Sequence, residues 1–167
     1  FKHVIFVSKE GKSSFLNIFP EMKEKTLVCN NLIDSKKIKK LAEEKVNEKK
    51  DEGITTFINV GRHDEKQKKL TRIIEVAKRL KMNGYRFKML WIGDGPDSNF
   101  YKEEIRKNKL QENIELLGRK QNPYPYFKIS DCVILTSDYE GYPVVFLESF
   151  ILNKPIITTK VSDYEQV

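Results

Sequence analysis

Two glutamates and a glycine turn lie where a strand-like segment gives way to a helix-like one. Residues 132–136 read Cys-Val-Ile-Leu-Thr, the pattern of a buried strand. Beyond them, Gly141 permits a tight turn and Pro143 suits the first turn of a helix. Glu140 and Glu148 therefore bracket a helix start at the carboxyl end of an expected parallel strand, where open α/β sheets bind ligands.

The chemistry of this segment matches a nucleotide sugar. Free N–H groups and the dipole at a helix start attract phosphate, and carboxylates accept hydrogen bonds from sugar hydroxyls. Eight residues separate Glu140 from Glu148, so orienting hydroxyls is a simpler role for them than paired acid–base catalysis. A solvated helix Glu is the alternative for Glu148, but its apolar neighbours Leu147 and Phe150 predict a buried helix.

Two cations follow an earlier strand. Residues 55–60 predict a strand that Gly61 closes, and Arg62 and Lys68 come next. If the strands run parallel, both cations share a sheet edge with Glu140, where they could clamp a diphosphate and offset leaving-group charge. The alternative is two more surface cations among the 31 lysines and arginines.

Two further turns belong to the same expected edge. The segment from Gly93 to Gly95 is GxG without the third glycine of a dinucleotide fingerprint, so it predicts a strand-to-helix turn whose backbone lines a pocket. The loop from Gly118 through Arg119 to Tyr124 is placed to hold a base, and a generic polar loop is equally open. No Walker phosphate loop occurs, which disfavours ATP or GTP hydrolysis.

Composition narrows the class of protein. The 167 residues carry a net charge of +7, but the lysines are dispersed among acids and no RNA-binding or zinc-finger signature occurs, which disfavours nucleic acid as a partner. Attraction to anionic lipid or to a phosphorylated substrate stays open. Cys29 and Cys132 lie in strand-like runs and are interpreted as small buried thiols. Neither His3 nor His63 has a Cys or His nearby at the spacing that metal ligands require. A metal-free, cytoplasmic domain is therefore expected.

The order of elements predicts an α/β fold with a doubly wound, mostly parallel sheet. Strands are expected at residues 3–7, 26–29, 55–60, 87–92, 114–117, 131–137 and 155–159. Helices are expected at residues 12–19, 35–47 with Ser35 as the cap, about 70–83, 98–109, 124–130 and 144–152. Residues 48–53 are charged and end in Gly, as a linker does. The chain lacks an initiator Met and stops at a predicted helix start, so we expect a piece of a larger protein.

In order and spacing, these motifs resemble the retaining GT-B glycosyltransferases of the large group-1 family, over nearly the whole chain. The resemblance is carried by Val60-Gly61-Arg62 with Lys68, Ile92 to Pro96, Leu117-Gly118, and Glu140 to Pro143 with Glu148. The segment from Asn122 to Tyr126 is similar to members that extend bacterial surface polysaccharides.

The resemblance implies an enzyme with a Rossmann-like C-terminal domain that binds a nucleotide-sugar donor. Arg62 and Lys68 would bind the diphosphate, and Glu148 the ribose hydroxyls. Glu140 and the backbone from Gly141 through Tyr142 and Pro143 to Val144 would meet the donor sugar and phosphate. Gly61, Gly93, Gly118 and Arg119 would line the rest of the donor site.

The family's chemistry is transfer of a hexose with retained configuration, without a metal. In its favoured mechanism the departing diphosphate deprotonates the acceptor on the front face. A UDP-sugar is the first expectation for the donor and a GDP-sugar the second. The acceptor would be a glycan or a lipid-linked molecule in polysaccharide biosynthesis, reached from the cytoplasm or at the inner face of a membrane.

Compared with the family's full length, residues 1–33 resemble the tail of the N-terminal acceptor domain. Residues 34–53 would be a connecting helix and linker, and residues 54–167 the donor-binding domain, incomplete at its C-terminus. Such a piece is expected to bind nucleotide without transferring sugar. Two rival functions stay open: another GT-B enzyme such as a sugar-nucleotide epimerase or phosphorylase, and a non-catalytic module that binds nucleotide or nucleic acid.

Overall fold

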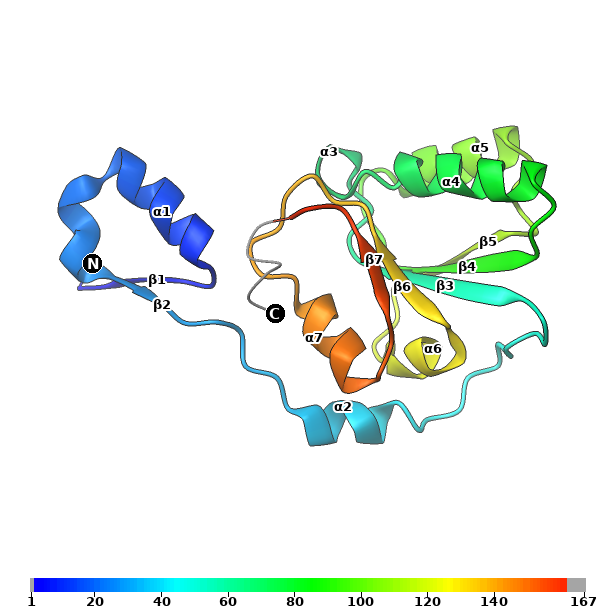
Figure 1. The fold of residues 1–167 in the computed structure, drawn as a ribbon, viewed down its shortest axis with the longest axis horizontal. Coiled ribbons are helices and arrows are strands. Elements are labelled where there is room, and N and C mark those ends of the chain that lie inside the picture. The colour runs from blue at the N-terminus through cyan, green and yellow to red at the C-terminus, as the bar shows by residue number, and fades with distance from the viewer. Residues whose placement is uncertain (1, 162–167) are drawn as a thin grey trace.

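The computed structural model describes residues 2–161 and contains one five-stranded, entirely parallel sheet (Figure 1). Its strands, in spatial order, are β5 (Ile114–Gly118), β4 (Phe87–Ile92), β3 (Thr55–Val60), β6 (Cys132–Leu135) and β7 (Ile156–Thr158). The chain moves outward from β3 to β5 and then returns to the other side of β3. The β3–β6 boundary is therefore the topological switch point, where such sheets open a crevice at their carboxyl edge.

Helices cover both faces of this sheet, as right-handed crossovers require (Figure 1). One face carries α4 (Thr71–Met82) and α5 (Ser98–Lys107), and the other carries α6 (Tyr124–Ile129), α7 (Val144–Ile151) and α2 (Ser35–Leu41). The alternation of β4 side chains supplies both cores: Met89 and Trp91 pack with α4 and α5, whereas Leu90 and Ile92 pack with α6 and α7. The predicted doubly wound α/β fold is thus confirmed.

A small N-terminal unit lies beside this body in Figure 1. It consists of β1 (Val4–Phe6), α1 (Lys9–Ile18), a 3₁₀ turn η1 (Pro20–Lys25) and β2 (Thr26–Val28). The two strands pair in parallel with each other. The carboxyl edge of the large sheet faces this unit, and a Cβ built at Gly141 would lie 3.6 Å from Cγ2 of Val7.

Several expected helix bounds were wrong or incomplete. The first helix begins at Lys9, with Ser8 as its cap, rather than at residue 12. Asp34, not Ser35, caps α2, because its carboxylate accepts from the Lys37 amide (3.0 Å). The helix ends at Leu41 rather than at residue 47, and the side-chain amide of Asn122 donates to the Leu41 carbonyl there (2.9 Å). A four-residue helix, α3 (Glu65–Lys68), was not predicted at all. The helix expected after Val161 lies outside the described residues.

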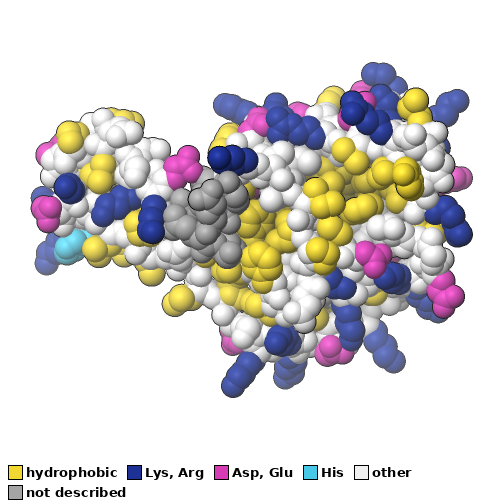
Figure 2. Space-filling model, in the orientation of Figure 1, with side chains coloured by type: hydrophobic (Ala, Val, Ile, Leu, Met, Phe, Trp, Pro, Cys, Tyr) yellow, Lys and Arg dark blue, Asp and Glu magenta, His cyan; other side chains and the backbone are white. Residues whose placement is uncertain are grey.

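Surface charge is dispersed on the face drawn in Figure 2, where lysines and arginines project around the periphery among acids. Hydrophobic side chains gather nearer the middle of this face. Of the two thiols, Cys132 is buried as expected, but Cys29 is exposed, which corrects that interpretation. No helix among residues 2–161 has the length and apolar character needed to cross a bilayer.

Candidate functional site

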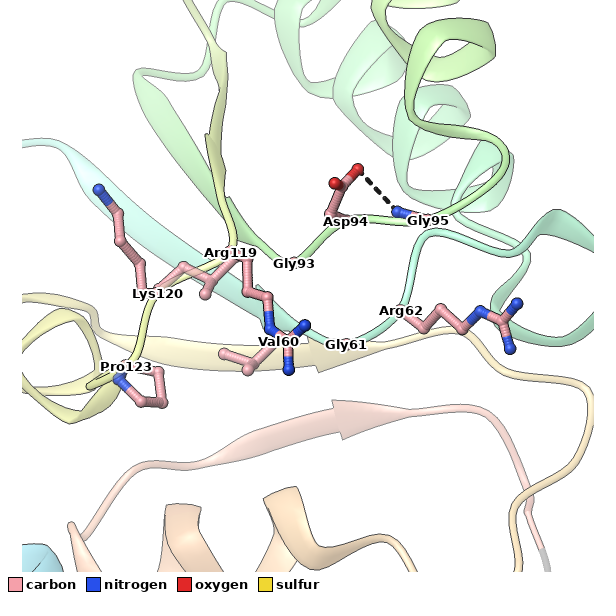
Figure 3. Close-up of a pocket in the computed structure, with 10 residues that line it drawn as sticks. Val60, Gly61, Arg62, Gly93, Asp94, Gly95, Arg119, Lys120 and Pro123 are labelled. Atoms are coloured by element: carbon pink, nitrogen blue, oxygen red, sulfur yellow. Dashed lines mark hydrogen bonds between the residues drawn. The ribbon is translucent and has the colours of Figure 1, made fainter.

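A cavity of about 530 Å³ lies at the carboxyl edge, within the size range of small-molecule sites. It is lined by Val60, Gly61, Arg62, Ile92, Gly93, Asp94, Gly95, Arg119, Lys120 and Pro123. Figure 3 shows the Arg62 and Arg119 side chains on either side of Gly61. Three consecutive parallel strands therefore contribute one wall each, and two guanidinium groups give the cavity a positive character.

The floor of this cavity depends on two glycines that bring the β3–α3 and β4–α5 loops into contact. Gly93 has φ +147°, and a Cβ built there would lie 1.8 Å from the Gly61 carbonyl oxygen. A Cβ at Gly95 would lie 2.3 Å from the carbonyl oxygen of His63. Backbone atoms cannot yield as a flexible side chain can, so only glycine fits either position.

A chain of hydrogen bonds behind the cavity fixes the tautomer of His63, and burial keeps the ring neutral. Hydrogen bonds from Ser98 Oγ (2.6 Å) and from the Gly95 amide (2.8 Å) lower the pKa of Asp94, which therefore only accepts. The single hydroxyl hydrogen of Ser98 points to Asp94, so Nδ1 of His63 must donate to Ser98 Oγ (2.9 Å). Burial lowers the pKa of His63, and the nearby Asp94 charge only partly offsets this. His63 is thus a neutral structural group and no proton source at neutral pH.

Lys68 and Glu140 meet at the switch point. The Lys68 ammonium lies 2.5 Å from Oε1 of Glu140, and their side chains are only 16% and 11% exposed. Ser137 Oγ donates to the same carboxylate oxygen (2.6 Å). A Cβ at Gly61 would lie 3.6 Å from Cε of Lys68, so the pair adjoins the cavity floor. An ion pair so largely desolvated is weak evidence for stability, because removing two charges from water offsets much of their attraction.

Glu148 lies in a second cavity of about 280 Å³, bounded by α2, the segment before it and α7. Tyr124 OH donates to its Oε1 (3.0 Å). Burial raises the pKa of Glu148 above its ordinary value, and the tyrosine hydrogen bond acts weakly against this. Burial and the Glu148 charge raise the pKa of Tyr124 to about 12, so its hydroxyl remains a donor.

The predicted site residues fall into three neighbouring groups. Gly61, Arg62, Gly93 and Arg119 line the larger cavity, Lys68 and Glu140 form the ion pair, and Glu148 and Val144 line the smaller cavity. Gly118 accepts from the Gly93 amide through its carbonyl (3.0 Å). Gly141, Tyr142 and Pro143 form the turn that leads into α7. The sequence predicted that Glu148 is buried because its helix is buried, but Phe150 of that helix is 52% exposed. The partial burial of Glu148 comes instead from Tyr124 and α2.

Sequence reasoning gave no individual role to Ser137, Glu65 or the Asp94–Ser98 pair, and it placed Tyr124 only at the end of the loop expected to hold a base. The contacts of Tyr124 with Glu148 and of Glu65 with Tyr101 join residues that are distant in sequence. Ser137 with Glu140 and Ser98 with Asp94 are only three and four residues apart, and Thr136-Ser137 is a local signal, a polar pair directly after an apolar strand. Among residues 2–161 no group of three or more His, Cys, Asp and Glu side chains is placed to hold a metal ion.

The fold agrees with solved GT-B glycosyltransferases. TarM of S. aureus superimposes with a TM-score of 0.78 at 19% identity, covering 96% of this chain and 30% of TarM. HepE of Anabaena, solved with UDP-glucose, superimposes with a TM-score of 0.76 at 18% identity, covering 99% of this chain and 46% of HepE. At these identities the likeness shows the Rossmann-like α/β fold.

Sequence comparison shows the family: the chain belongs to the glycosyl transferases of group 1, whose family model matches residues 39–167. An uncharacterised glycosyltransferase of Methanocaldococcus jannaschii is 33% identical over 161 residues, which is 93% of this chain and 39% of that protein. The amylovoran biosynthesis glycosyltransferase AmsD of Erwinia amylovora is 31% identical over 83 residues, which is 50% of this chain and 23% of AmsD. The chain thus spans two fifths or less of the length of these relatives.

Proposed function

We propose that this chain binds the nucleotide-sugar donor of a retaining hexosyltransferase, which transfers the sugar to a glycan or lipid-linked acceptor in polysaccharide biosynthesis. The observation that carries the proposal is the nearly buried Lys68–Glu140 pair at the topological switch point, beside a cavity with two arginines. A UDP-sugar is the favoured donor, as in the HepE complex. The name of the amylovoran relative supports a polysaccharide product.

In this assignment the base of the nucleotide occupies the cavity between the β4 and β5 ends, near Gly93 and Arg119. The diphosphate meets Arg62 and Lys68, together with the free amides at the start of α7. Glu140 orients the donor sugar and positions Lys68 through their ion pair, and Glu148 accepts from the ribose hydroxyls.

Catalysis by this arrangement is electrostatic. As the glycosidic bond breaks, negative charge develops on the leaving diphosphate, and the cations stabilise it. Transfer with retention follows if the acceptor attacks from the face that the diphosphate leaves, with a diphosphate oxygen taking the acceptor proton. The chain's own role is to bind and orient the donor. The acceptor side is assigned to the N-terminal part of the whole enzyme, of which residues 1–33 are the proposed tail.

A thermal-shift panel of UDP, GDP and ADP, with and without chelator, tests this proposal. A nucleotide at about a hundredfold its dissociation constant should stabilise the fold by roughly 2.7 kcal/mol, and chelator should change nothing. Arg62→Ala removes a charge-assisted contact of about 1.5–3 kcal/mol, so it should weaken diphosphate binding roughly 10- to 100-fold.

Arg106→Ala is the matched control, because Arg106 is an exposed cation on α5 away from the cavity. It should bind nucleotide as the unaltered chain does. Equal weakening by both substitutions, or salt-sensitive binding of random RNA without saturable nucleotide binding, would refute the assignment.

A further inference from the structure

The short helix α3 carries Lys68 but has little stability of its own. Four residues form a single turn, and helix nucleation in isolation is unfavourable. It is followed by Lys69 in the left-handed region at φ +50°. The position of Lys68 therefore depends on contacts that hold α3 from outside.

The C-terminal end of α3 is bound to the β6–α7 loop. Thr136 Oγ1 donates to the carbonyl oxygens of Lys68 and Lys69, both at 3.0 Å. The Asp138 amide donates to the Gln67 carbonyl (2.9 Å). These contacts join α3 to the loop that carries Glu140.

The N-terminal end of α3 is held by Glu65. Its carboxylate accepts from Tyr101 OH (3.0 Å) on α5, and from Thr71 Oγ1 (2.5 Å) and the Thr71 amide (3.3 Å) at the start of α4. Its own amide donates to Oδ2 of Asp97 (2.7 Å). Tyr101 is completely buried, so its hydroxyl position is fixed by packing against Trp91 and His63.

We propose that Glu65 is a positioning residue that sets the place of Lys68 against the β-phosphate of the donor, by tying α3 to Tyr101 and Thr71. This inference rests on the proposed function. Glu65 forms no part of the lining of the larger cavity. It acts through the helix, which spans the β4–α5 side of the site and the β6–α7 side.

Comparing UDP with UMP tests the inference, because only UDP has the phosphate assigned to Lys68. Glu65→Ala should lower the affinity for UDP about tenfold and leave the affinity for UMP within about twofold. Tyr101→Phe removes one hydroxyl and keeps the ring in the core, so it should give a smaller loss of the same selectivity. Glu65→Gln keeps one acceptor oxygen and should restore part of the UDP affinity.

Lys66→Ala is the control, since Lys66 is an exposed residue of the same helix. It should change neither affinity. Equal loss for UDP and UMP, or unchanged UDP affinity in both Glu65→Ala and Tyr101→Phe, would overturn the positioning role while leaving the proposed function intact. If the unaltered chain binds no nucleoside diphosphate, UDP and GDP included, the proposed function fails and this inference fails with it.

Discussion

Glu148 is a carboxyl group whose ionisation the fold opposes. Burial beside α2 raises its pKa, because these surroundings disfavour the charged form. The hydrogen bond from Tyr124 OH only partly compensates. Groups retained at such a cost are frequent at ligand sites, which is consistent with a ribose-binding role.

Glu148→Gln should therefore affect stability and binding in opposite directions. The unfolded chain loses this proton near the ordinary pKa of 4.5, before the folded chain does, so stability falls as pH rises above that value. We expect the melting temperature of Glu148→Gln to rise relative to the unaltered chain between pH 4 and pH 7. UDP binding should weaken about 3- to 10-fold, because a carboxylate acceptor is lost.

Glu112→Gln is the control for this experiment, since Glu112 is exposed in the turn before β5. Its melting temperature should follow that of the unaltered chain at every pH. A difference between Glu148→Gln and the unaltered chain that stays constant from pH 4 to pH 7 would contradict the raised pKa.

Some residues of the site were predictable from sequence and others were not. Arg62, Lys68 and Glu140 stand beside glycine turns that follow apolar strands, and those local patterns point to one sheet edge. The direct contact of Lys68 with Glu140 joins residues 72 positions apart and follows only from strand order. For the same reason, no local pattern could have linked Tyr124 to Glu148 or Tyr101 to Glu65.

At the scale of elements, the crossing of the β3–α3 and β4–α5 loops determines the floor of the larger cavity. The amide of Gly61 donates to the Ile92 carbonyl (3.0 Å), and that of His63 donates to the Asp94 carbonyl (3.1 Å). This spacing leaves no room for a side chain at Gly93.

Gly93→Ala should destabilise the chain by about 3 kcal/mol or more, because the new methyl would overlap the Gly61 carbonyl and force the backbone apart. Gly118→Ala is the matched comparison: it also has positive φ (+66°), but a Cβ there has no neighbour within 4 Å. It should cost only about 1–2 kcal/mol of conformational strain. Urea unfolding of the two variants measures both values, and equal losses would show that the close approach is unimportant.

The bounds of β3 and β4 agree with the sequence patterns, because both segments are rich in β-branched and aromatic residues and lie between glycines. The helices α2 and α3 do not agree. The last carbonyl of α2 accepts from Asn122, which lies 81 residues away. The four residues of α3 include no apolar one, and polar contacts from distant elements hold this helix. Intrinsic helix propensity therefore explains neither where α2 ends nor why α3 forms.

At the scale of the whole molecule, the N-terminal unit and the five-stranded body have separate strand pairing. Both apolar clusters of the body are built from residues after Leu41, and the unit contributes none of their members. Ile5, Leu27 and Ile18 of the unit are more than half exposed. The body should accordingly fold without the unit, as the predicted division at residue 33 requires.

Deleting residues 1–31, while retaining the Asp34 cap, should shift the melting temperature of the body by less than about 4 °C. UDP binding should persist, because the assigned donor contacts all lie after residue 60. Thermal unfolding and titration of the shortened chain measure both quantities. Loss of cooperative unfolding would show that the unit and the body form one folding unit.

The sequence by itself determined the parallel α/β class, the glycine turns and the cations and acids beside them. These depend on neighbours along the chain, through apolar periodicity and backbone freedom. Only the tertiary structure decided that Lys68 meets Glu140, that Glu65 holds α3 through Tyr101, and that Glu148 lies in a cavity apart from Arg62. Lys68 meets Glu140 because the chain adds strands first on one side of β3 and then on the other, which brings the β3–α3 and β6–α7 loops together at one edge.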